Sequence, residues 1–220
     1  MTWFTIGISG ITCGGKTTLA TKFYNYLSDE NTPKQFGNIR INRVVLIQQD
    51  KYFWPRDNPK HIWIDEINFI NREVMSAMDM DQMWADVEEV LTPQANSVTA
   101  VDQQNNSPVS NGALINLNIL IIEGFLIFNY DPIYDLCQIK YHFQLPYDLC
   151  LQRRLKRNFK HVNPQPEKYF AEFIWPSYRK HLDELKNSKE IIYLNGEHNK
   201  EEIFKLAFHY FIEAALRANA

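Results

Sequence analysis

The chain has 220 residues, a formal net charge of −3 and 45% hydrophobic residues. This length fits one domain, with room for a lid or an insertion, and the composition is typical of a soluble globular protein. The slight excess of acidic residues argues against a broad basic surface for nonspecific nucleic-acid binding, so no nucleic-acid partner is expected.

The apolar pattern predicts alternating strands and helices. Strands are expected at 3–8, 43–48, 118–123, 140–145 and 190–194. Helices are expected at 16–28, 73–91, 147–159, 168–187 and 200–217. This alternation predicts an α/β fold, a three-layer sandwich in which helices cover both faces of a five-stranded parallel sheet. The polar, turn-rich stretches 31–42 and 102–113 are expected to be surface loops.

Targeting signals and membrane spans are not evident. The longest apolar run, 117–130, is interrupted by Glu123 and Gly124 and is too short and polar to cross a bilayer. No basic residue precedes Lys16, unlike in a typical presequence. Three cysteines without metal-like spacing fit a reducing compartment. We therefore expect a cytoplasmic protein without a membrane partner; its oligomeric state stays open.

Residues 10–17 match the G-x-x-x-x-G-K-[ST] phosphate-binding loop. The loop lies between a predicted buried strand and a predicted amphipathic helix, an arrangement that directs a helix N-terminus at an anion. Lys16 supplies positive charge to the β- and γ-phosphates, and the Thr17 hydroxyl is an oxygen ligand for Mg²⁺. The residues expected to contact the nucleotide here are Gly10, Ile11, Thr12, Cys13, Gly14, Gly15, Lys16, Thr17 and Thr18.

Two further apolar strands end close to an acid. Glu123 closes one of them, at the sheet edge where the acidic partner of a phosphate loop is expected, and is predicted to contribute to Mg²⁺ binding. Asp50 follows the other and can accept a hydroxyl proton from the acceptor of a phosphoryl group. The next aromatic residues, Tyr52 and Phe53, can stack on a flat ring or pack in the core.

Arginines cluster on the predicted helix 147–159. Arg153, Arg154 and Arg157 share one helical face through spacings of three and four. Arginines at the start of a lid can stabilise charge on a transferred phosphoryl group, whereas the alternative is a solvated basic patch. A Pro-bearing loop follows, and we expect a lid at about 157–169.

Six segments, in this order, resemble the nicotinamide riboside kinases, which belong with the uridine kinases among P-loop nucleoside kinases. They read GISGITCGGKTTLA, QQDKYF, ILIIEGFLIFNY, LPYDLCLQRRLKR, IWPSY and YLNG. The resemblance covers residues 3 to about 210 and implies one P-loop kinase domain over 1–220. It also implies an enzyme that uses ATP and Mg²⁺ to phosphorylate the 5′-hydroxyl of nicotinamide riboside, or of nicotinic acid riboside. The product would be nicotinamide mononucleotide, used in NAD biosynthesis.

The resemblance also implies roles for individual residues. Asp50 matches the proton acceptor and lies near the metal, while Thr17 matches the direct Mg²⁺ ligand. Arg154 matches the residue that grips the substrate ribose. Arg153 and Arg157 match residues on the ATP side of the site.

Three acceptor-site residues depart from the family pattern. Arg72 and Glu73 align where an aromatic residue and Asp are usual, and Phe159 where Tyr is common. Glu73 can still accept hydrogen bonds from ribose hydroxyls. Arg72 beside a cationic nicotinamide ring is unfavourable unless it points away or pairs with Glu73.

Two other functions stay open. Uridine or cytidine phosphorylation would avoid the conflict at Arg72. A nucleotide-dependent binding module would need a guanine-reading motif and a D-x-x-G switch, and neither is found in the sequence. The near match at 199–202 lacks the required Asp and is expected to cap the last helix.

Overall fold

A computed structural model describes residues 2–92, 114–157 and 166–218. The predicted loop at 102–113, Phe159 and most of the predicted lid lie outside these residues.

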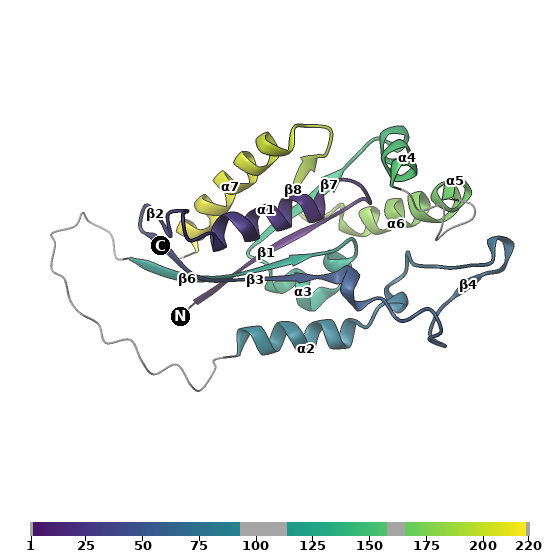
Figure 1. Ribbon diagram of the computed structural model, residues 1–220, viewed down its shortest axis with the longest axis horizontal. Coiled ribbons are helices and arrows are strands. Elements are labelled where there is room, and N and C mark those ends of the chain that lie inside the picture. Colours follow the sequence, from purple (N-terminus) through teal and green to yellow (C-terminus); the bar gives the residue numbers. More distant parts are fainter. Residues whose placement is uncertain (1, 93–113, 158–165, 219–220) are drawn as a thin grey trace.

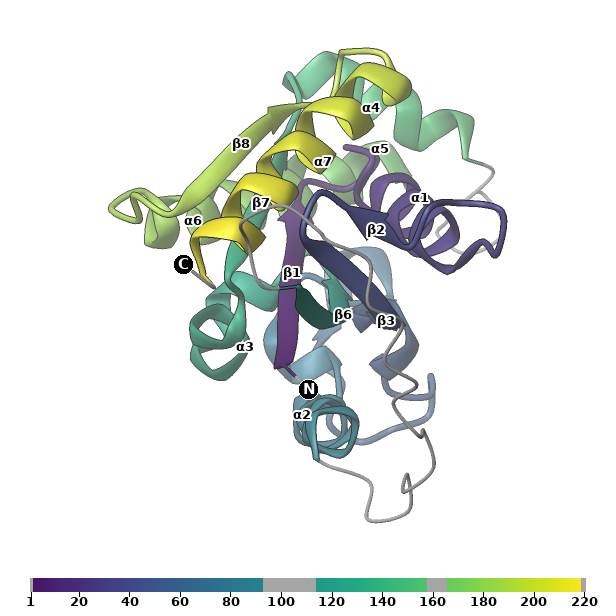
Figure 2. The same ribbon diagram turned by 90° about the vertical axis from the view of Figure 1, so that its left-hand side faces the viewer.

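Six strands form the main sheet, in the order β2-β3-β6-β1-β7-β8 (Figures 1 and 2). Their bounds are β1 Thr2–Gly10, β2 Gln35–Phe36, β3 Ile39–Gln48, β6 Ile115–Glu123, β7 Ile139–Gln144 and β8 Ile191–Asn195. All pairings are parallel except that of β2 with β3, so the predicted five-stranded parallel core is confirmed. Within β6, Ile119 and Ile121 pack on one face and Leu120 and Ile122 on the other, as expected of a parallel strand covered on both sides.

The surface loop predicted for 31–42 is wrong in part, because β2 and the start of β3 form a hairpin at the sheet edge. Ile39 and Ile41 alternate with polar residues and are buried, the pattern of a half-buried strand. Gly37 has a φ of 63°, which allows the tight turn between the two strands.

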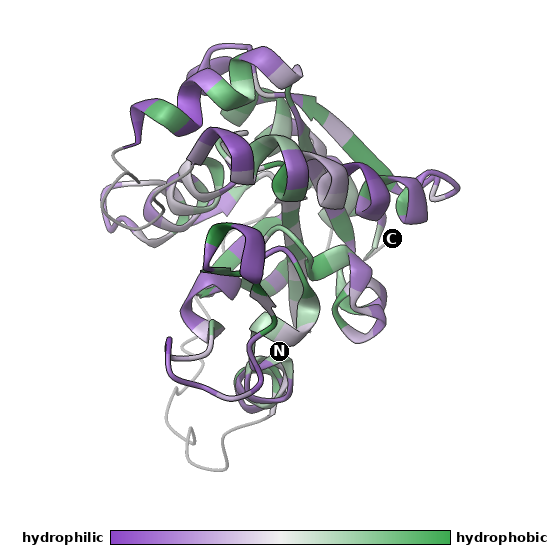
Figure 3. Ribbon diagram, turned by 90° about the vertical axis from the view of Figure 1, so that its right-hand side faces the viewer, coloured by the Kyte–Doolittle hydropathy of each residue, from purple (hydrophilic) through white to green (hydrophobic). Residues whose placement is uncertain are grey.

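Helices cover both faces of the sheet (Figure 2). On one face, α1 (Lys16–Ser28) and α7 (Lys200–Arg217) pack through Phe23, Phe204 and Phe211. On the other lie α2 (Met80–Leu91) and α3 (Asp131–Leu136). The ribbon coloured by hydropathy shows apolar segments gathered in the central strands (Figure 3). Within the described ranges, no helix combines the length and hydropathy that a membrane span requires.

Three short helices gather beyond the carboxyl ends of the strands: α4 (Tyr147–Lys156), α5 (Pro166–Tyr169) and α6 (Trp175–Leu185) (Figure 1). The predicted helix 168–187 is interrupted by a π-helical turn over Phe170–Ile174. Pro176 explains the interruption, because it has no backbone N–H to bond one helical turn back.

The helix predicted for 73–91 starts later than expected. It begins at Met80, because the Asp79 carboxylate accepts a bond from the Gln82 N–H at 3.1 Å and caps it. Residues Met75–Ala77 form a 3₁₀ turn instead. The small hairpin of β4 (Trp63–Ile64) and β5 (Phe69–Ile70) was not predicted.

Candidate active site

The strand register brings the predicted acids and the phosphate loop to one edge of the sheet. Glu123, the last residue of β6, pairs with Ile8 of β1 and with Gln48 of β3. Asp50 therefore follows β3 by two residues at the same level as Gly10, the end of β1. Parallel strands place their ligand sites at such an edge.

The phosphate loop wraps tightly between β1 and α1. Gly10 has a φ of 125°, and a Cβ built there would lie 2.3 Å from the Phe143 carbonyl oxygen. Gly15, with a φ of 116°, immediately precedes the helix. Only glycine adopts these conformations without strain, so the loop backbone can approach a phosphate closely.

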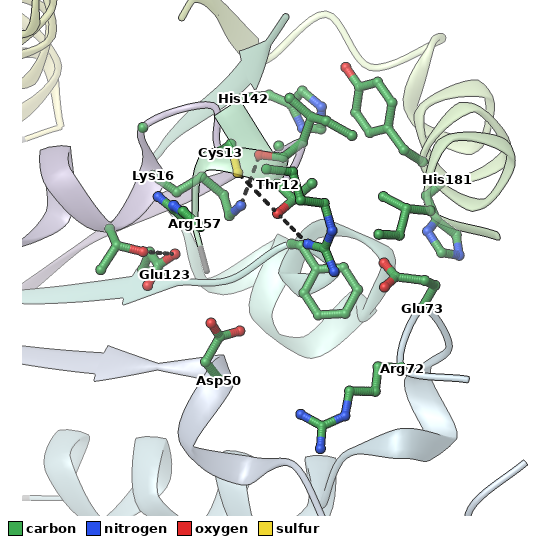
Figure 4. Close-up of a pocket in the computed structure, with 18 of the residues that line it drawn as sticks. Thr12, Cys13, Lys16, Asp50, Arg72, Glu73, Glu123, His142, Arg157 and His181 are labelled. Atoms are coloured by element: carbon green, nitrogen blue, oxygen red, sulfur yellow. Dashed lines mark hydrogen bonds between the residues drawn. The ribbon is translucent and has the colours of Figure 1, made fainter. Parts of the chain in front are cut away.

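Lys16 and Thr17 extend from the first turn of α1 toward the acids. The Lys16 Nζ donates to the Ile11 carbonyl at 3.0 Å, and the Thr17 hydroxyl donates to Glu123 Oε1 at 3.1 Å (Figure 4). Burial raises the pKa of Glu123, Lys16 opposes that rise and the like charge of Asp50 adds to it. A cation bound here would relieve this repulsion between carboxylates.

Asp50 lies in a 3₁₀ turn over Gln49–Tyr52 and is exposed to the cavity. Its neighbour Gln49 is fully buried, and the Gln49 Oε1 accepts from the Leu126 N–H at 3.0 Å. This bond ties the turn to the segment after β6. It therefore fixes the backbone that carries Asp50 relative to Glu123.

One cavity of about 230 Å³ joins these groups (Figure 4). Of the predicted site residues, it is lined by Gly10, Ile11, Thr12, Cys13, Gly15, Lys16, Thr17, Thr18, Asp50, Phe53, Arg72, Glu73, Glu123, Arg154 and Arg157. It is also lined by Phe125, His142, Ile174, Tyr178 and His181, which the sequence reasoning missed. The last three belong to the helical end of the molecule, and their spacing gave no sign that they face the phosphate loop.

Glu73 and Asp50 project into this cavity from different segments (Figure 4). Burial raises the pKa of Glu73, while Arg154, the Tyr169 hydroxyl and Lys16 lower it. Arg154 also donates to the Thr12 hydroxyl at 3.1 Å, so it links the Glu73 side of the cavity with the phosphate loop.

Arg72 points away from Glu73 (Figure 4). Its guanidinium lies 5.4 Å from the centre of the Phe53 ring, which in turn stacks on Phe125 at 6.1 Å. Among the described residues no ion pair joins Arg72 to Glu73. Of the two ways in which the sequence allowed Arg72 to coexist with a cationic ring, the pairing with Glu73 is absent among the described residues. Arg72 itself lines the cavity.

Arg153 holds the other side of the loop. Its Nη1 donates to the carbonyls of Cys13 at 3.3 Å and Gly196 at 2.9 Å. A second hollow opens beside this bridge, lined in part by Gly14, Arg157 and His198. The two hollows thus flank the phosphate loop, as expected if one receives the phosphate donor and the other the acceptor.

Of the two roles that the sequence allowed for Tyr52, stacking on a substrate ring or packing in the core, the structure shows packing. The Tyr52 hydroxyl donates to Asp86 Oδ2 on α2 at 2.7 Å, and its ring packs in the apolar cluster between α2 and the sheet. The 3₁₀ turn after β3 causes this, because strand alternation no longer decides which way the side chain faces. Tyr52 does not line the cavity described above.

The donor set fits Mg²⁺. Two carboxylates and a hydroxyl, from Glu123, Asp50 and Thr17, meet beside a loop shaped for phosphate. In the described part of the chain, no group of three His, Cys, Asp or Glu forms a closed metal site. Mg²⁺ is usually held in this open way, by one or two carboxylates together with substrate phosphates and water.

The fold and the site together define a P-loop kinase. A family model described as "Phosphoribulokinase / Uridine kinase family" matches residues 5–200. A gluconokinase from Sinorhizobium meliloti 1021 has a similar fold, with a TM-score of 0.52 at 11% identity, covering 98% of this chain and 95% of that one.

Similar sequences are more specific. Nicotinamide riboside kinase 1 of Rattus norvegicus is 33% identical, covering 94% of this chain and 93% of its own length. The Homo sapiens protein of that name is 31% identical, covering 97% and 94%. A uridine kinase of Vibrio parahaemolyticus is 24% identical, covering 93% and 92%. The chain belongs to the phosphoribulokinase/uridine kinase family and, within it, to the nicotinamide riboside kinases, which confirms the resemblance seen in the sequence.

Proposed function

We propose that the protein transfers the γ-phosphate of ATP to the 5′-hydroxyl of nicotinamide riboside, giving nicotinamide mononucleotide for NAD biosynthesis. Nicotinic acid riboside is a second acceptor. The observation that carries this proposal is the similarity to nicotinamide riboside kinases, at 31–33% identity over more than nine-tenths of both chains. We place the reaction in the cytoplasm, where the three free cysteines would stay reduced.

In this proposal the loop residues and Lys16 hold the donor phosphates. Thr17, Glu123 and Asp50 hold Mg²⁺, which when bound offsets the charge of the β- and γ-phosphates. Arg157 lines both hollows and can reach a phosphate from either side, while Arg153 keeps the loop in place beside the donor.

On the acceptor side, Asp50 orients the 5′-hydroxyl and accepts its proton. The proton leaves late in a loose phosphoryl-transfer transition state, so orientation matters more than the basicity of the carboxylate. Glu73 accepts hydrogen bonds from the ribose hydroxyls, and Arg154 grips the ribose from the phosphate-loop side. Glu73 and Arg154 line the same cavity as Asp50, which supports these roles.

Phe53 offers the acceptor ring an apolar surface. The Arg72 guanidinium lies against the same Phe53 ring and so does not itself favour a cationic acceptor. The choice of nicotinamide riboside rests on the similarity to the nicotinamide riboside kinases. Uridine or cytidine as the preferred acceptor is less well supported, since the uridine kinases compared are only 24% identical.

The direct test is product identification. The purified protein is incubated with ATP, Mg²⁺ and nicotinamide riboside, and we expect ADP and nicotinamide mononucleotide in equal amounts by mass spectrometry. ADP release without the mononucleotide, or no turnover, would contradict the proposal.

A further inference from the structure

A buried tyrosine outside the phosphate loop is joined to the acceptor side of the cavity. Tyr169, in α5, is 1% exposed. Its hydroxyl donates to Glu73 Oε1 at 3.2 Å and accepts from the Arg72 backbone N–H at 3.0 Å. One phenol thus contacts both the backbone and the carboxylate of a segment almost one hundred residues earlier in the chain.

The ring of Tyr169 is held by packing. Phe69 of β5 meets it edge-on at 5.1 Å, and Phe173 stacks on it at 5.6 Å. A phenol confined in this way has few rotamers, so its hydroxyl is directed at one place. A Tyr169→Phe change would keep the packing and remove only the hydroxyl.

Glu73 needs such a partner. The protein surrounds it, although its side chain is partly accessible from the cavity. The charged groups that act on it are Arg154, Lys16 and Asp50, and the Tyr169 hydroxyl is its hydrogen-bond donor. A desolvated carboxylate without a fixed donor becomes easier to protonate and freer to rotate.

We propose that Tyr169 is a positioning residue, which holds the Glu73 carboxylate in the orientation that receives the acceptor's ribose hydroxyls. The inference rests on the proposed function, because that function assigns Glu73 to the acceptor. The hydroxyl acts through Glu73, and it also holds the backbone of the same segment through the Arg72 N–H.

Steady-state kinetics of Tyr169→Phe test this. We expect KM for the acceptor to rise roughly 10-fold, because a hydrogen bond to a charged group is lost, while KM for ATP changes less than about twofold. Tyr147→Phe is the matched control. Tyr147 packs on Phe170 in the same apolar cluster, and its hydroxyl has no hydrogen-bond partner among the described residues.

Two readouts separate positioning from a simple contribution to folding. First, Tyr169→Phe should have little additional effect in a Glu73→Gln background, because the residue acts through Glu73. Second, the acidic limb of kcat/KM for the acceptor should move to higher pH in Tyr169→Phe, since the lost bond stabilises the ionised carboxylate. Additive effects, an unshifted limb or an unchanged acceptor KM would overturn the inference.

The acceptor used is the nucleoside that the wild-type protein phosphorylates fastest. If the wild-type protein phosphorylates other nucleosides but not nicotinamide riboside, the proposed substrate is wrong. The role of Tyr169 is judged separately, from the acceptor KM of Tyr169→Phe relative to that of the wild type on the fastest nucleoside. Inactivity on every nucleoside overturns both. If Tyr169→Phe does not fold, 3-fluorotyrosine at position 169 keeps the ring and strengthens the donor. The acidic limb should then move to lower pH, and an unshifted limb would again overturn the inference.

Discussion

Replacing Asp50 with Asn tests the chemistry of the site most sharply. The carboxylate lines the cavity and is exposed to it, and it makes no hydrogen bond or ion pair with any described residue. The nearby structural anchor is the buried amide of Gln49, which the change leaves intact. We therefore expect the free energy of unfolding to change by less than about 0.5 kcal/mol.

The same change should have a much larger effect on kcat than on the free energy of unfolding. Loss of a group that orients and deprotonates the attacking hydroxyl typically costs 10²–10⁴-fold in rate, or about 3–5 kcal/mol of barrier. ATP binding without metal should stay within about threefold, because the loop glycines and Lys16 are unchanged. A coupled ADP-release assay gives kcat, calorimetry gives the Kd for ATP, and thermal unfolding reports stability. Asp57→Asn, at an exposed acid five residues beyond the end of the turn at Tyr52, is the control. A kcat of Asp50→Asn within threefold of wild type, with normal folding, would refute the role of Asp50.

Three further variants test individual structural claims. Gly10→Ala should lose ATP binding and about 3 kcal/mol or more of stability, because its Cβ would lie 2.3 Å from the Phe143 carbonyl. Gly37→Ala, also at positive φ but in open space, should cost only about 1 kcal/mol in the same thermal unfolding assay; equal losses would contradict the steric argument. Tyr52→Phe should lower stability by about 1 kcal/mol and leave kcat/KM unchanged, because only the bond to Asp86 is lost. A large decrease in kcat/KM would instead show that Tyr52 acts in the substrate site. His142→Phe should raise stability by about 1–2 kcal/mol at pH 7, since neither nitrogen of this buried imidazole has a partner among the described residues. Burial lowers the pKa of His142 to about 3, so below its ordinary value of about 6.5 the unfolded chain binds a proton that the folded chain does not. Urea unfolding should therefore show wild-type stability falling from pH 6.5 toward 3, and this component should be absent in His142→Phe.

Local sequence patterns predicted the phosphate loop and the elements around it. The phosphate loop, the five parallel strands and the two acids near strand ends follow from short-range rules of apolar pattern and glycine spacing. The helix cap at Asn199 also followed from a local rule, and its Oδ1 accepts from the Glu201 N–H at 2.8 Å.

The acceptor side was harder to predict because it depends on long-range contacts. The pairing of Tyr169 with Glu73 joins two segments that no local pattern relates. The sequence left Tyr52 between substrate stacking and core packing, because a 3₁₀ turn redirects side chains after β3. The π-helical turn at Phe170–Ile174 has one local sign, Pro176, although the apolar pattern alone predicts a continuous helix.

The measurement that tests the account most directly is a panel of nucleosides assayed with ATP and Mg²⁺. The panel contains nicotinamide riboside, nicotinic acid riboside, uridine and cytidine, and kcat/KM is compared for each. We expect nicotinamide riboside to exceed uridine and cytidine by at least tenfold. A kcat/KM for uridine greater than that for nicotinamide riboside would contradict the proposed substrate. Phosphoryl transfer from ATP to a nucleoside would then be the only part of the proposal still supported.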